Sequence, residues 1–278
     1  MGATVITDAI RILDQNGVPY GVKHAANKPR VSATPYLYDV VIGNIPGHTR
    51  IIVNGKNGDI DNATEDLWEP GGTYVYIPAG GIQLSLVSTS ADDTAAGTGV
   101  RTVDVDVLLA DYSAATITLT LNGVTPVLST ETNILRINDF HAMTVGSGGA
   151  PAGTVTLKNV AATITYAQLT PPYNAMRQAI YTVPLGKTLY IVAWKYGAGL
   201  AGVYANFLLR ATTSNTDELL PVDLFHIREE GVVEGGSEYV VLPVPIKILA
   251  TSDVKVSAIS DGAASNAICT SGFAGWLE

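Results

Sequence analysis

The fold class of this chain is decided by two stretches, Thr102-Val-Asp-Val-Asp-Val107 and Thr116-Ile-Thr-Leu-Thr-Leu121. In each stretch apolar and polar residues alternate with a period of two, so an extended strand carries its apolar side chains on one face. The dipeptide Asn122-Gly123 follows the second stretch and predicts a hairpin-like corner. Two neighbouring strands of this kind predict an antiparallel sheet with one buried face and one solvated face.

Similar short β-patterned runs, separated by Pro and Gly turns, extend in both directions from these strands. Those before them are Tyr36–Ile42, Arg50–Val53, Tyr74–Ile77 and Ile82–Leu86, and those in the last third include Ala179–Pro184, Lys187–Trp194, Tyr239–Pro245, Asp253–Ile259 and Gly272–Glu278. Turns are predicted at Pro46-Gly47, Asn54-Gly55 and Pro78-Ala-Gly-Gly81, because Pro fixes φ and Gly accepts positive φ. The pattern predicts an all-β chain with few helices.

The composition limits the class of protein. At 278 residues the chain is long enough for one large domain or two smaller ones. Charged residues make up only 15% of it, against roughly 25% in a typical soluble protein. Two interpretations remain open: a β-rich core, or a protein that buries much of its exterior against partners. No apolar run approaches the roughly 18 to 20 residues of a membrane helix, so we expect no contact with a membrane.

We expect two tandem antiparallel β-sandwich domains, jelly-roll-like, that follow an N-terminal arm. The predicted division is an arm at residues 1–35, a first sandwich at 36–170 and a second sandwich at 171–278. The glycine-rich loop Gly146–Gly153, together with Pro171-Pro172, brackets the predicted boundary between the sandwiches.

Two weaker local patterns accompany this division. Ile77-Pro78-Ala-Gly80 and Val183-Pro184-Leu-Gly186 both read Ile or Val, then Pro-x-Gly, before a predicted strand, which suggests a repeat. Short helical turns are predicted at Thr7–Leu13 in the arm and at Asn174–Gln178 in the linker.

The net charge of −9 argues against direct binding of nucleic acid through the general field of the protein. A basic island interrupts this acidic chain between Val22 and Thr34, and it is read either as a solvated arm or as a strap that docks on an acidic neighbouring subunit. Its members are Lys23, His24, Lys28 and Arg30. Cys269 is the only cysteine, which excludes an intrachain disulfide and a thiolate-rich metal site.

No catalytic or metal-ligating cluster is recognisable in the sequence. The four histidines, His24, His48, His141 and His226, have no further His or Cys within metal-ligand spacing. We interpret His226 as a strand residue satisfied by a neighbour. Gly146-Ser147-Gly148 lacks the flanking helix that an exposed nucleophile requires. We therefore predict no catalytic residue, no cofactor site, no metal site and no enzyme activity.

One acidic segment remains a candidate for ion binding. Asn57–Glu69 places carboxylates at alternate positions, as Ca²⁺ prefers, although it does not fit the EF-hand loop. The alternative is an exposed acidic loop in which Thr64 caps a short turn that buries Trp68. Whether an ion sits at Asp59–Glu69 stays open at this point.

Two further patterns have a functional and a structural interpretation. Paired carboxylates such as Asp92-Asp93 serve glycoside hydrolysis, but nothing places a second acid at the required distance. Trp194 and Tyr196 flank Lys195 and lie on one face of a strand, where they either stack on a sugar or belong to the core.

A resemblance to a known family is carried by turn-and-strand signatures. The segments Ala95-Ala-Gly-Thr-Gly-Val-Arg-Thr-Val103 and Thr118-Leu-Thr-Leu-Asn122-Gly-Val-Thr-Pro-Val127 resemble virion structural proteins of tailed bacteriophages, especially marine and cyanobacterial ones. The resemblance continues in Ile180–Lys187, Leu242–Lys247, Asp253–Ile259 and Ser271–Phe273, and covers roughly residues 70–278. None of these motifs carries chemistry.

The resemblance implies a structural protein located in the virion, with other virion proteins of the shell or tail as partners. We expect a capsid decoration or cement protein that forms a homo-oligomer and stabilises the shell through subunit contacts. Three alternatives remain: a major capsid protein of the double jelly-roll type, a receptor-binding tail fibre or spike, and an enzyme such as a glycan depolymerase. The missing acid/base and metal clusters argue against the enzyme.

Overall fold

The computed structural model describes residues 23–25, 28–30, 36–199, 204–261 and 267–278. The chain divides into two compact units, Met1–Ile45 and Pro46–Glu278, and each is described by itself. The regular structure is almost entirely antiparallel β-sheet, so the expected all-β fold is confirmed. No helix within these ranges is long and apolar enough to span a membrane.

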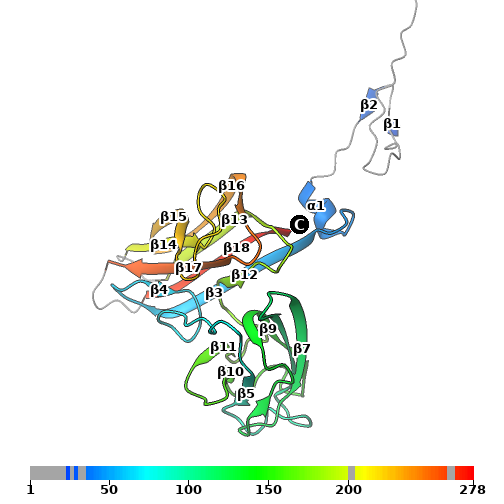
Figure 1. The fold of residues 1–278 in the computed structure, drawn as a ribbon, viewed down its shortest axis with the longest axis vertical. Helices are drawn as coiled ribbons and strands as arrows, with labels where there is room; N and C mark the ends of the chain where they lie inside the picture. The colour runs from blue at the N-terminus through cyan, green and yellow to red at the C-terminus, as the bar shows by residue number, and fades with distance from the viewer. Residues whose placement is uncertain (1–22, 26–27, 31–35, 200–203, 262–266) are drawn as a thin grey trace, which may run out of the picture. The chain divides into compact units, whose positions relative to one another are not determined.

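The larger unit contains two β-sandwich lobes (Figure 1). The jelly-roll lobe consists of β3 (Thr49–Ile60), β4 (Glu65–Asp66), β12 (Ile180–Thr182), β13 (Leu189–Ala198), β14 (Tyr204–Ala211), β15 (His226–Glu234), β16 (Gly236–Ile248), β17 (Asp253–Ser260) and β18 (Ala267–Leu277). One of its sheets has the order β16-β13-β18-β3, and the other has the order β12-β17-β14-β15, with β4 paired to β17.

The strand order of this lobe is that of a jelly roll. When β3 and β12 to β18 are counted 1 to 8 along the chain, the two sheets read 1-8-3-6 and 2-7-4-5. Strand 1 pairs with 8, 2 with 7, 3 with 6 and 4 with 5, and every pair is antiparallel. The lobe is therefore one long hairpin, rolled up so that successive pairs alternate between the two sheets.

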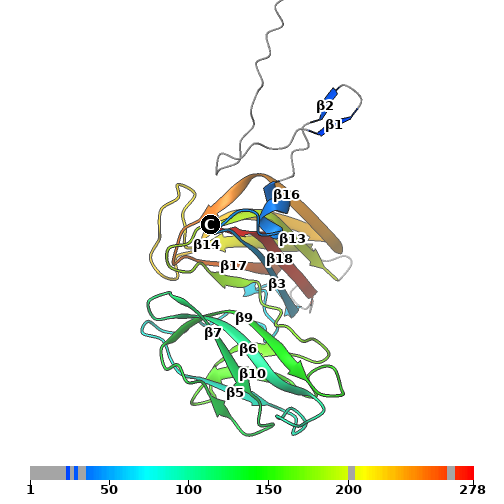
Figure 2. The ribbon, with the colours of Figure 1, turned by 90° about the vertical axis from the view of Figure 1, so that its right-hand side faces the viewer.

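The inserted lobe lies in the chain between the first and second strands of the jelly roll (Figure 2). Its strands are β5 (Leu84–Ser88), β6 (Val100–Leu109), β7 (Ala114–Thr120), β8 (Val127–Leu128), β9 (Ile134–Val145), β10 (Val155–Asn159) and β11 (Thr165–Leu169). Their orders are β11-β10-β5-β8 and β7-β6-β9. Counted 1 to 7, these read 7-6-1-4 and 3-2-5, so this lobe is an antiparallel sandwich of a different order from the jelly roll.

The alternation that decides the fold class is confirmed in the inserted lobe. Val103, Val105 and Val107 on β6 are almost completely buried in its core, and β6 pairs antiparallel with β7. The opposite face is polar, because Thr118 donates a hydrogen bond to Asp104 (2.6 Å) and the neighbouring Thr116 does the same to Asp106. One face of this sheet is therefore apolar and buried, and the other is polar and solvated, as predicted.

The chain enters the jelly roll earlier than the sequence suggests. Val53, Ile60 and Leu67 belong to the same core cluster as the C-terminal strands, because β3 and β4 pair with β18 and β17. The expected tandem sandwiches at residues 36–170 and 171–278 therefore require correction: the jelly roll is built from both ends of the larger unit, around an insertion. The physical reason is the pairing of its first strand with its last.

The smaller unit contains a short ladder and one helix. β1 (Lys23–Ala25) pairs antiparallel with β2 (Lys28–Arg30), and α1 (Tyr36–Val41) follows. The ladder runs through the backbone of the predicted basic island. The predicted helical turn at Thr7–Leu13 and most of the expected arm lie outside the described residues.

The predicted strand at Tyr36–Ile42 is wrong, because most of this segment forms α1. The amide N–H of Gly43 donates to the carbonyl oxygen of Val40 (3.2 Å), and that of Asn44 donates to the carbonyl oxygen of Asp39 (2.9 Å). With the positive φ of Gly43 (77°), these two bonds form a Schellman motif that ends the helix. The apolar pattern of Tyr36–Ile42 is compatible with a strand or a helix, and the Schellman motif at its end stabilises the helix.

The predicted turn at Asn54-Gly55 is also wrong, because both residues lie in the middle of β3. A Cβ added to Gly55 would overlap the carbonyl oxygen of Leu67 and the backbone of Ala179, which cross the strand here. The glycine is required for this close approach of two backbones and has no positive φ. The same residue type serves turns and close approaches, so sequence alone does not distinguish them.

Two further predictions fail in the segments that connect the lobes. Tyr74–Ile77 is irregular although a strand was expected, and Asn174–Gln178 is extended although a helical turn was expected. Within the second segment, Ala175 forms a β-bridge with His141 and Gln178 forms one with Trp68. These tertiary bridges override the weak local preference for helix.

The two Pro-x-Gly segments form equivalent turns. The amide N–H of Gly81 donates to the carbonyl oxygen of Pro78 (3.1 Å), and that of Lys187 donates to the carbonyl oxygen of Pro184 (3.2 Å). The third residue of each turn is a glycine with positive φ. The predicted turn at Pro78–Gly81 is confirmed, and the apparent repeat reflects a shared turn in two lobes of different strand order.

The lobes of the larger unit are joined by a buried ion pair. Arg136 on β9 binds Asp253 at the start of β17 through two bonds, Nε to Oδ1 (2.9 Å) and Nη2 to Oδ2 (3.0 Å). The side chains are only 5% and 4% exposed. Nη1 donates to the carbonyl oxygens of Ile77 and Leu135. Burial lowers the pKa of Arg136, but the hydrogen bonds and charge of Asp253 outweigh this effect, and the pKa is raised overall.

Neutral hydrogen bonds support this ion pair. Asn138 on β9 and Thr182 on β12 exchange two bonds, in which the Asn138 amide nitrogen donates to the carbonyl oxygen of Thr182 (2.8 Å) and the Asn138 oxygen accepts from its backbone N–H (2.9 Å). The hydroxyl of Thr182 donates to Asp253. The junction therefore fixes one strand of the inserted lobe against two strands of the jelly roll.

A second buried ion pair joins Asp66 on β4 to Lys255 on β17 (2.9 Å). The backbone N–H of Tyr74 and the hydroxyl of Ser257 also donate to Asp66. Between the two ion pairs the ring of Tyr76 lies 4.7 Å from the Arg136 guanidinium, close enough for a cation–π contact. Burial, and then the charge of Asp253, raises the pKa of Tyr76.

The close approach at Gly55 gives a test of the observed β3. We expect Gly55→Ala to destabilise the protein by about 1–3 kcal/mol, because the added methyl group forces two backbones apart. Gly58→Ala on the same strand is the matched control, since a Cβ there has open space. Its effect should stay within about 0.5 kcal/mol. Urea unfolding of both variants measures this, and equal stabilities would contradict the observed strand.

The ion pair at the junction gives a second prediction. We expect Arg136→Met to cost about 3–5 kcal/mol, because it leaves the Asp253 carboxylate buried without a cation. The double variant Arg136→Met/Asp253→Asn should recover part of this loss. Arg101→Met is the control, because the partly exposed Arg101 forms one side-chain hydrogen bond, to the carbonyl oxygen of Gly97. Urea unfolding that shows the same small loss for Arg136→Met and Arg101→Met would contradict the role of the pair.

Candidate functional site

The histidines lie apart from one another in the described part of the larger unit. His141 contacts Asp139 (Nδ1 to Oδ2, 2.8 Å), His48 contacts the carbonyl oxygen of Pro46, and His226 is exposed at the start of β15. The side chain of His24 lies outside what the structure describes. Among the described residues, no group of three or more His, Cys, Asp and Glu side chains is placed to hold a metal ion.

Three carboxylates of the acidic segment Asn57–Glu69 have partners within the protein that lie in different places. Asp66 is buried against Lys255, Glu69 forms an ion pair with Arg177, and Glu65 accepts hydrogen bonds from the Asn57 amide (2.8 Å) and a backbone N–H. The carboxylates therefore point to different partners instead of converging on one point. The segment also includes strands β3 and β4, so the expected exposed loop is only partly observed.

Asp93 has a structural role in the inserted lobe. Its side chain is fully buried and accepts hydrogen bonds from the hydroxyl of Ser88 (2.6 Å) and from the backbone N–H groups of Val100, Ala152 and Gly153. The glycine-rich loop Gly146–Gly153, which sequence reasoning placed at a domain boundary, is thus tied to the lobe. With both oxygens bonded, Asp93 is not available as a catalytic acid.

Trp194 and Tyr196 belong to the core of the jelly roll. They are 2% and 8% exposed, their ring centroids lie 4.4 Å apart, and Tyr196 also packs on Phe207. The interpretation as a sugar-stacking pair is therefore wrong, and the core interpretation is confirmed. Lys195 between them points to the opposite face and is exposed.

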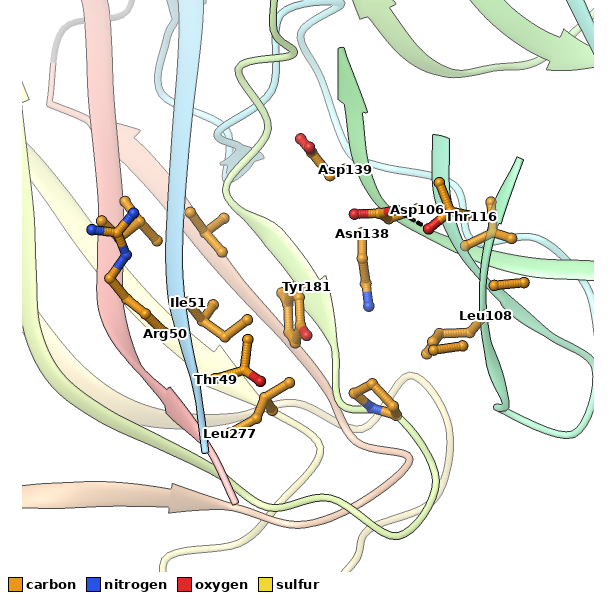
Figure 3. Close-up of a pocket in the computed structure, with 16 residues that line it drawn as sticks. Thr49, Arg50, Ile51, Asp106, Leu108, Thr116, Asn138, Asp139, Tyr181 and Leu277 are labelled. Atoms are coloured by element: carbon orange, nitrogen blue, oxygen red, sulfur yellow. Dashed lines mark hydrogen bonds between the residues drawn. The ribbon is translucent and has the colours of Figure 1, made fainter. Parts of the chain in front are cut away.

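Two clefts remain as candidate sites. The first has a volume of about 490 Å³ and lies where the inserted lobe faces the jelly roll (Figure 3). Figure 3 shows Asp106 and Asn138 of the inserted lobe across the cleft from Tyr181, while Arg50 extends away from the cleft. Burial, and then the charge of Asp106, raises the pKa of Tyr181.

The polar groups of this first cleft are already engaged in local contacts. Asp106 accepts a hydrogen bond from Thr116 (2.7 Å), Asp139 contacts His141, and Asn138 is bonded to the backbone of Thr182. These bonds hold the two lobes and the wet face of β6, β7 and β9 in position. The cleft is therefore a junction between lobes whose polar side chains serve the fold.

The second cleft, of about 610 Å³, lies on the outer face of the sheet β16-β13-β18-β3. Cross-strand neighbours on this face form rows, and one row contains Tyr239, Lys195, Gly272 and Asn54. The next row contains Ser237, Gly197, Thr270 and Lys56. Gly272 in the first row and Gly197 in the second carry no side chain, so the face is lower at these two central positions.

The same face carries cations and exposed apolar side chains. We define the basic face by Arg50, Lys56, Lys195, Ile52, Tyr239 and Val241. Ile52 is 54% exposed, Tyr239 66% and Val241 68%. Among the described residues, none of the three cations forms an ion pair. One carboxylate, that of Glu238, is among the groups that line the cleft. Exposed apolar side chains that gather on one face mark surfaces of interaction.

Sequence reasoning missed this face, because its residues come from three separate strands, β3, β13 and β16. The residues of β3 join the others only through the pairing of β3 with β18. A local signal was present in β13, where Lys195 lies between the two core aromatics Trp194 and Tyr196. A cation at the outward position of a strand is informative only when the neighbouring strands are known.

The comparisons with known proteins leave the family open. No family model matches the chain, and no curated protein matches it. Among solved structures, the chain is similar to one from the structure of infectious bursal disease virus, Gt strain, with 10% identity over 88% of this chain and 77% of that chain and a TM-score of 0.23. A second similar chain is from the Gx strain, with 11% identity, coverage of 88% and 75%, and a TM-score of 0.19. TM-scores of this size do not indicate a shared fold.

The single cysteine gives a test of the packing behind the basic face. Cys269 is fully buried on β18, and burial, followed by the charge of Glu65, raises the pKa of its thiol to about 12. Because the thiolate is the reactive form, we expect no alkylation by iodoacetamide at pH 8 in the folded protein and complete alkylation in urea. Mass spectrometry measures both. Rapid labelling without urea would contradict the observed burial of β18.

Proposed function

We propose that this chain is a non-enzymatic structural protein of a bacteriophage particle, and that it decorates the capsid shell as a homo-oligomer. It acts by covering and joining neighbouring shell subunits. Its partners are other virion proteins and further copies of itself, without direct contact to nucleic acid or membrane.

The observation that carries this proposal is the strand order of the jelly roll. The orders 1-8-3-6 and 2-7-4-5 occur in viral capsid proteins, lectins and cupins. Among these classes, the resemblance of roughly residues 70–278 to phage virion structural proteins favours the first. The exposed apolar side chains of the basic face add support, because a subunit of an assembly buries such side chains against its neighbours.

The strand order also bears on the alternatives. A double jelly-roll shell protein requires two jelly rolls, whereas the inserted lobe has the order 7-6-1-4 and 3-2-5. This observation favours decoration over a main-wall role of that type. A receptor-binding fibre or spike remains the second candidate, since lectins share the jelly-roll order. Saturable binding of a host glycan by the purified chain would favour it.

The test is to locate the chain in the particle. We expect antibodies raised against the purified protein, detected with gold on intact virions, to label the capsid surface at regular positions. Cryo-electron microscopy should then show density for one jelly roll and one inserted sandwich on top of a separate shell wall. Labelling confined to the tail would contradict the decoration role, and labelling of neither part would contradict the structural role altogether.

A further inference from the structure

The jelly-roll lobe carries a second charged surface, opposite in sign to the basic face. It lies on the outer side of β14 and β15, in the sheet β12-β17-β14-β15. We define the acidic face by Tyr204, Glu230, Val232, Glu234 and Asp261. Val232 is 56% exposed and Tyr204 50%, while both glutamates are exposed.

The alternation of β15 shows that this strand presents its acidic side outward. Val233 packs against the jelly-roll core, and a Cβ on Gly231 would overlap the ring of Tyr196, so these two positions face inward. Glu230, Val232 and Glu234 occupy the alternate positions and therefore face outward. Their cross-strand neighbours are Leu208, Asn206 and Tyr204.

The carboxylates of the acidic face have neutral partners. Glu230 accepts a hydrogen bond from the Asn206 amide (2.7 Å), and Asp261 accepts one from the backbone N–H of Tyr204 (3.0 Å). The hydrogen bond and the charge of Glu234 raise the pKa of Tyr204. None of these three carboxylates forms an ion pair within the described part of the chain. The negative charge is therefore available to a partner.

We propose that the basic face of one copy docks on the acidic face of a second copy, in a head-to-tail contact between jelly-roll lobes. Lys56 and Lys195 then lie opposite Glu230 and Glu234, and the exposed side chains of Tyr239 and Val241 are covered by those around Val232. The two faces lie on different sheets of the same lobe, so each copy has one of each. Such a contact forms a ring if the rotation that relates one copy to the next closes on itself, and an extended array if it does not.

Charge complementarity is the argument for a second copy as the occupant. In a chain of net charge −9, three unpaired cations gather on the face that also exposes Ile52, Tyr239 and Val241. The acidic face combines unpaired carboxylates with exposed apolar side chains of similar size. Opposite potentials over apolar centres steer two surfaces together and fix their orientation. The inference deepens the proposed function, because a decorating oligomer needs contacts between its copies.

Charge reversal on each face tests the contact. The basic-face variant is Lys56→Glu/Lys195→Glu, the acidic-face variant is Glu230→Lys/Glu234→Lys, and Lys158→Glu on the inserted lobe is the control. Sedimentation velocity over a range of concentrations measures the association of the purified full chain. We expect the unmodified chain and the control to associate, and each double variant alone to associate at least about tenfold more weakly.

The decisive step is to mix the two double variants in equal amounts. Every head-to-tail contact between them again joins opposite charges, so the mixture should regain the association of the unmodified chain. Raising the salt from about 50 mM to about 500 mM should weaken the association of the mixture and of the unmodified chain, because exposed charges are screened. Circular dichroism of each variant checks that the chain still folds.

Three outcomes would overturn the proposal: a monomeric unmodified chain at every concentration, double variants that associate as the unmodified chain does, or a mixture that fails to regain association. Binding of a polyanionic glycan to the basic face of a monomeric chain would overturn it in the same way and assign that face to another partner. This measurement uses the purified chain alone. Its outcome is therefore independent of the gold-labelling experiment, which tests the location of the chain in the virion.

Discussion

The pairing of β3 with β18 is the constraint on which the rest of the larger unit depends. It joins residues 49–60 to residues 267–277 along one antiparallel ladder, so strand 1 of the jelly roll lies beside strand 8. The other three pairs follow inside this one, as successive turns of the rolled hairpin. The basic face exists only because of the same pairing, since Arg50 and Lys56 come from β3, whereas Lys195 comes from β13.

Where a lobe is inserted after the first strand of a jelly roll, the chain must leave the jelly roll and return to it without disturbing its sheets. The buried ion pairs of Arg136 with Asp253 and of Asp66 with Lys255 lie where the chain does so. Buried charges cost desolvation energy, and a well-packed apolar junction would be at least as stable. A bidentate pair, however, has a defined geometry, and a protein whose lobes keep a fixed relation to each other presents surfaces of fixed orientation.

Local patterns in the sequence predicted most of the strands and the pair of β6 with β7, but not the pairing of strands that lie far apart in the chain. The alternation of Val103, Val105 and Val107 was sufficient for β6, because a period of two is a local property. Gly55 was read as a turn, since the backbone that crosses it comes from distant residues. The jelly-roll order and the basic face were beyond sequence reasoning for the same reason. The core position of Trp194 was one of two open interpretations, and burial decided it.

The most direct test of this account is native-state hydrogen exchange of the amides in β3. If β3 is the first strand of the jelly roll, its amides should open with the same free energy as those of β18 and β13, because all three belong to one cooperative sheet. Opening of β3 at a distinctly lower free energy than β18, or together with β5 and β10 of the inserted lobe, would contradict the pairing and the surfaces derived from it.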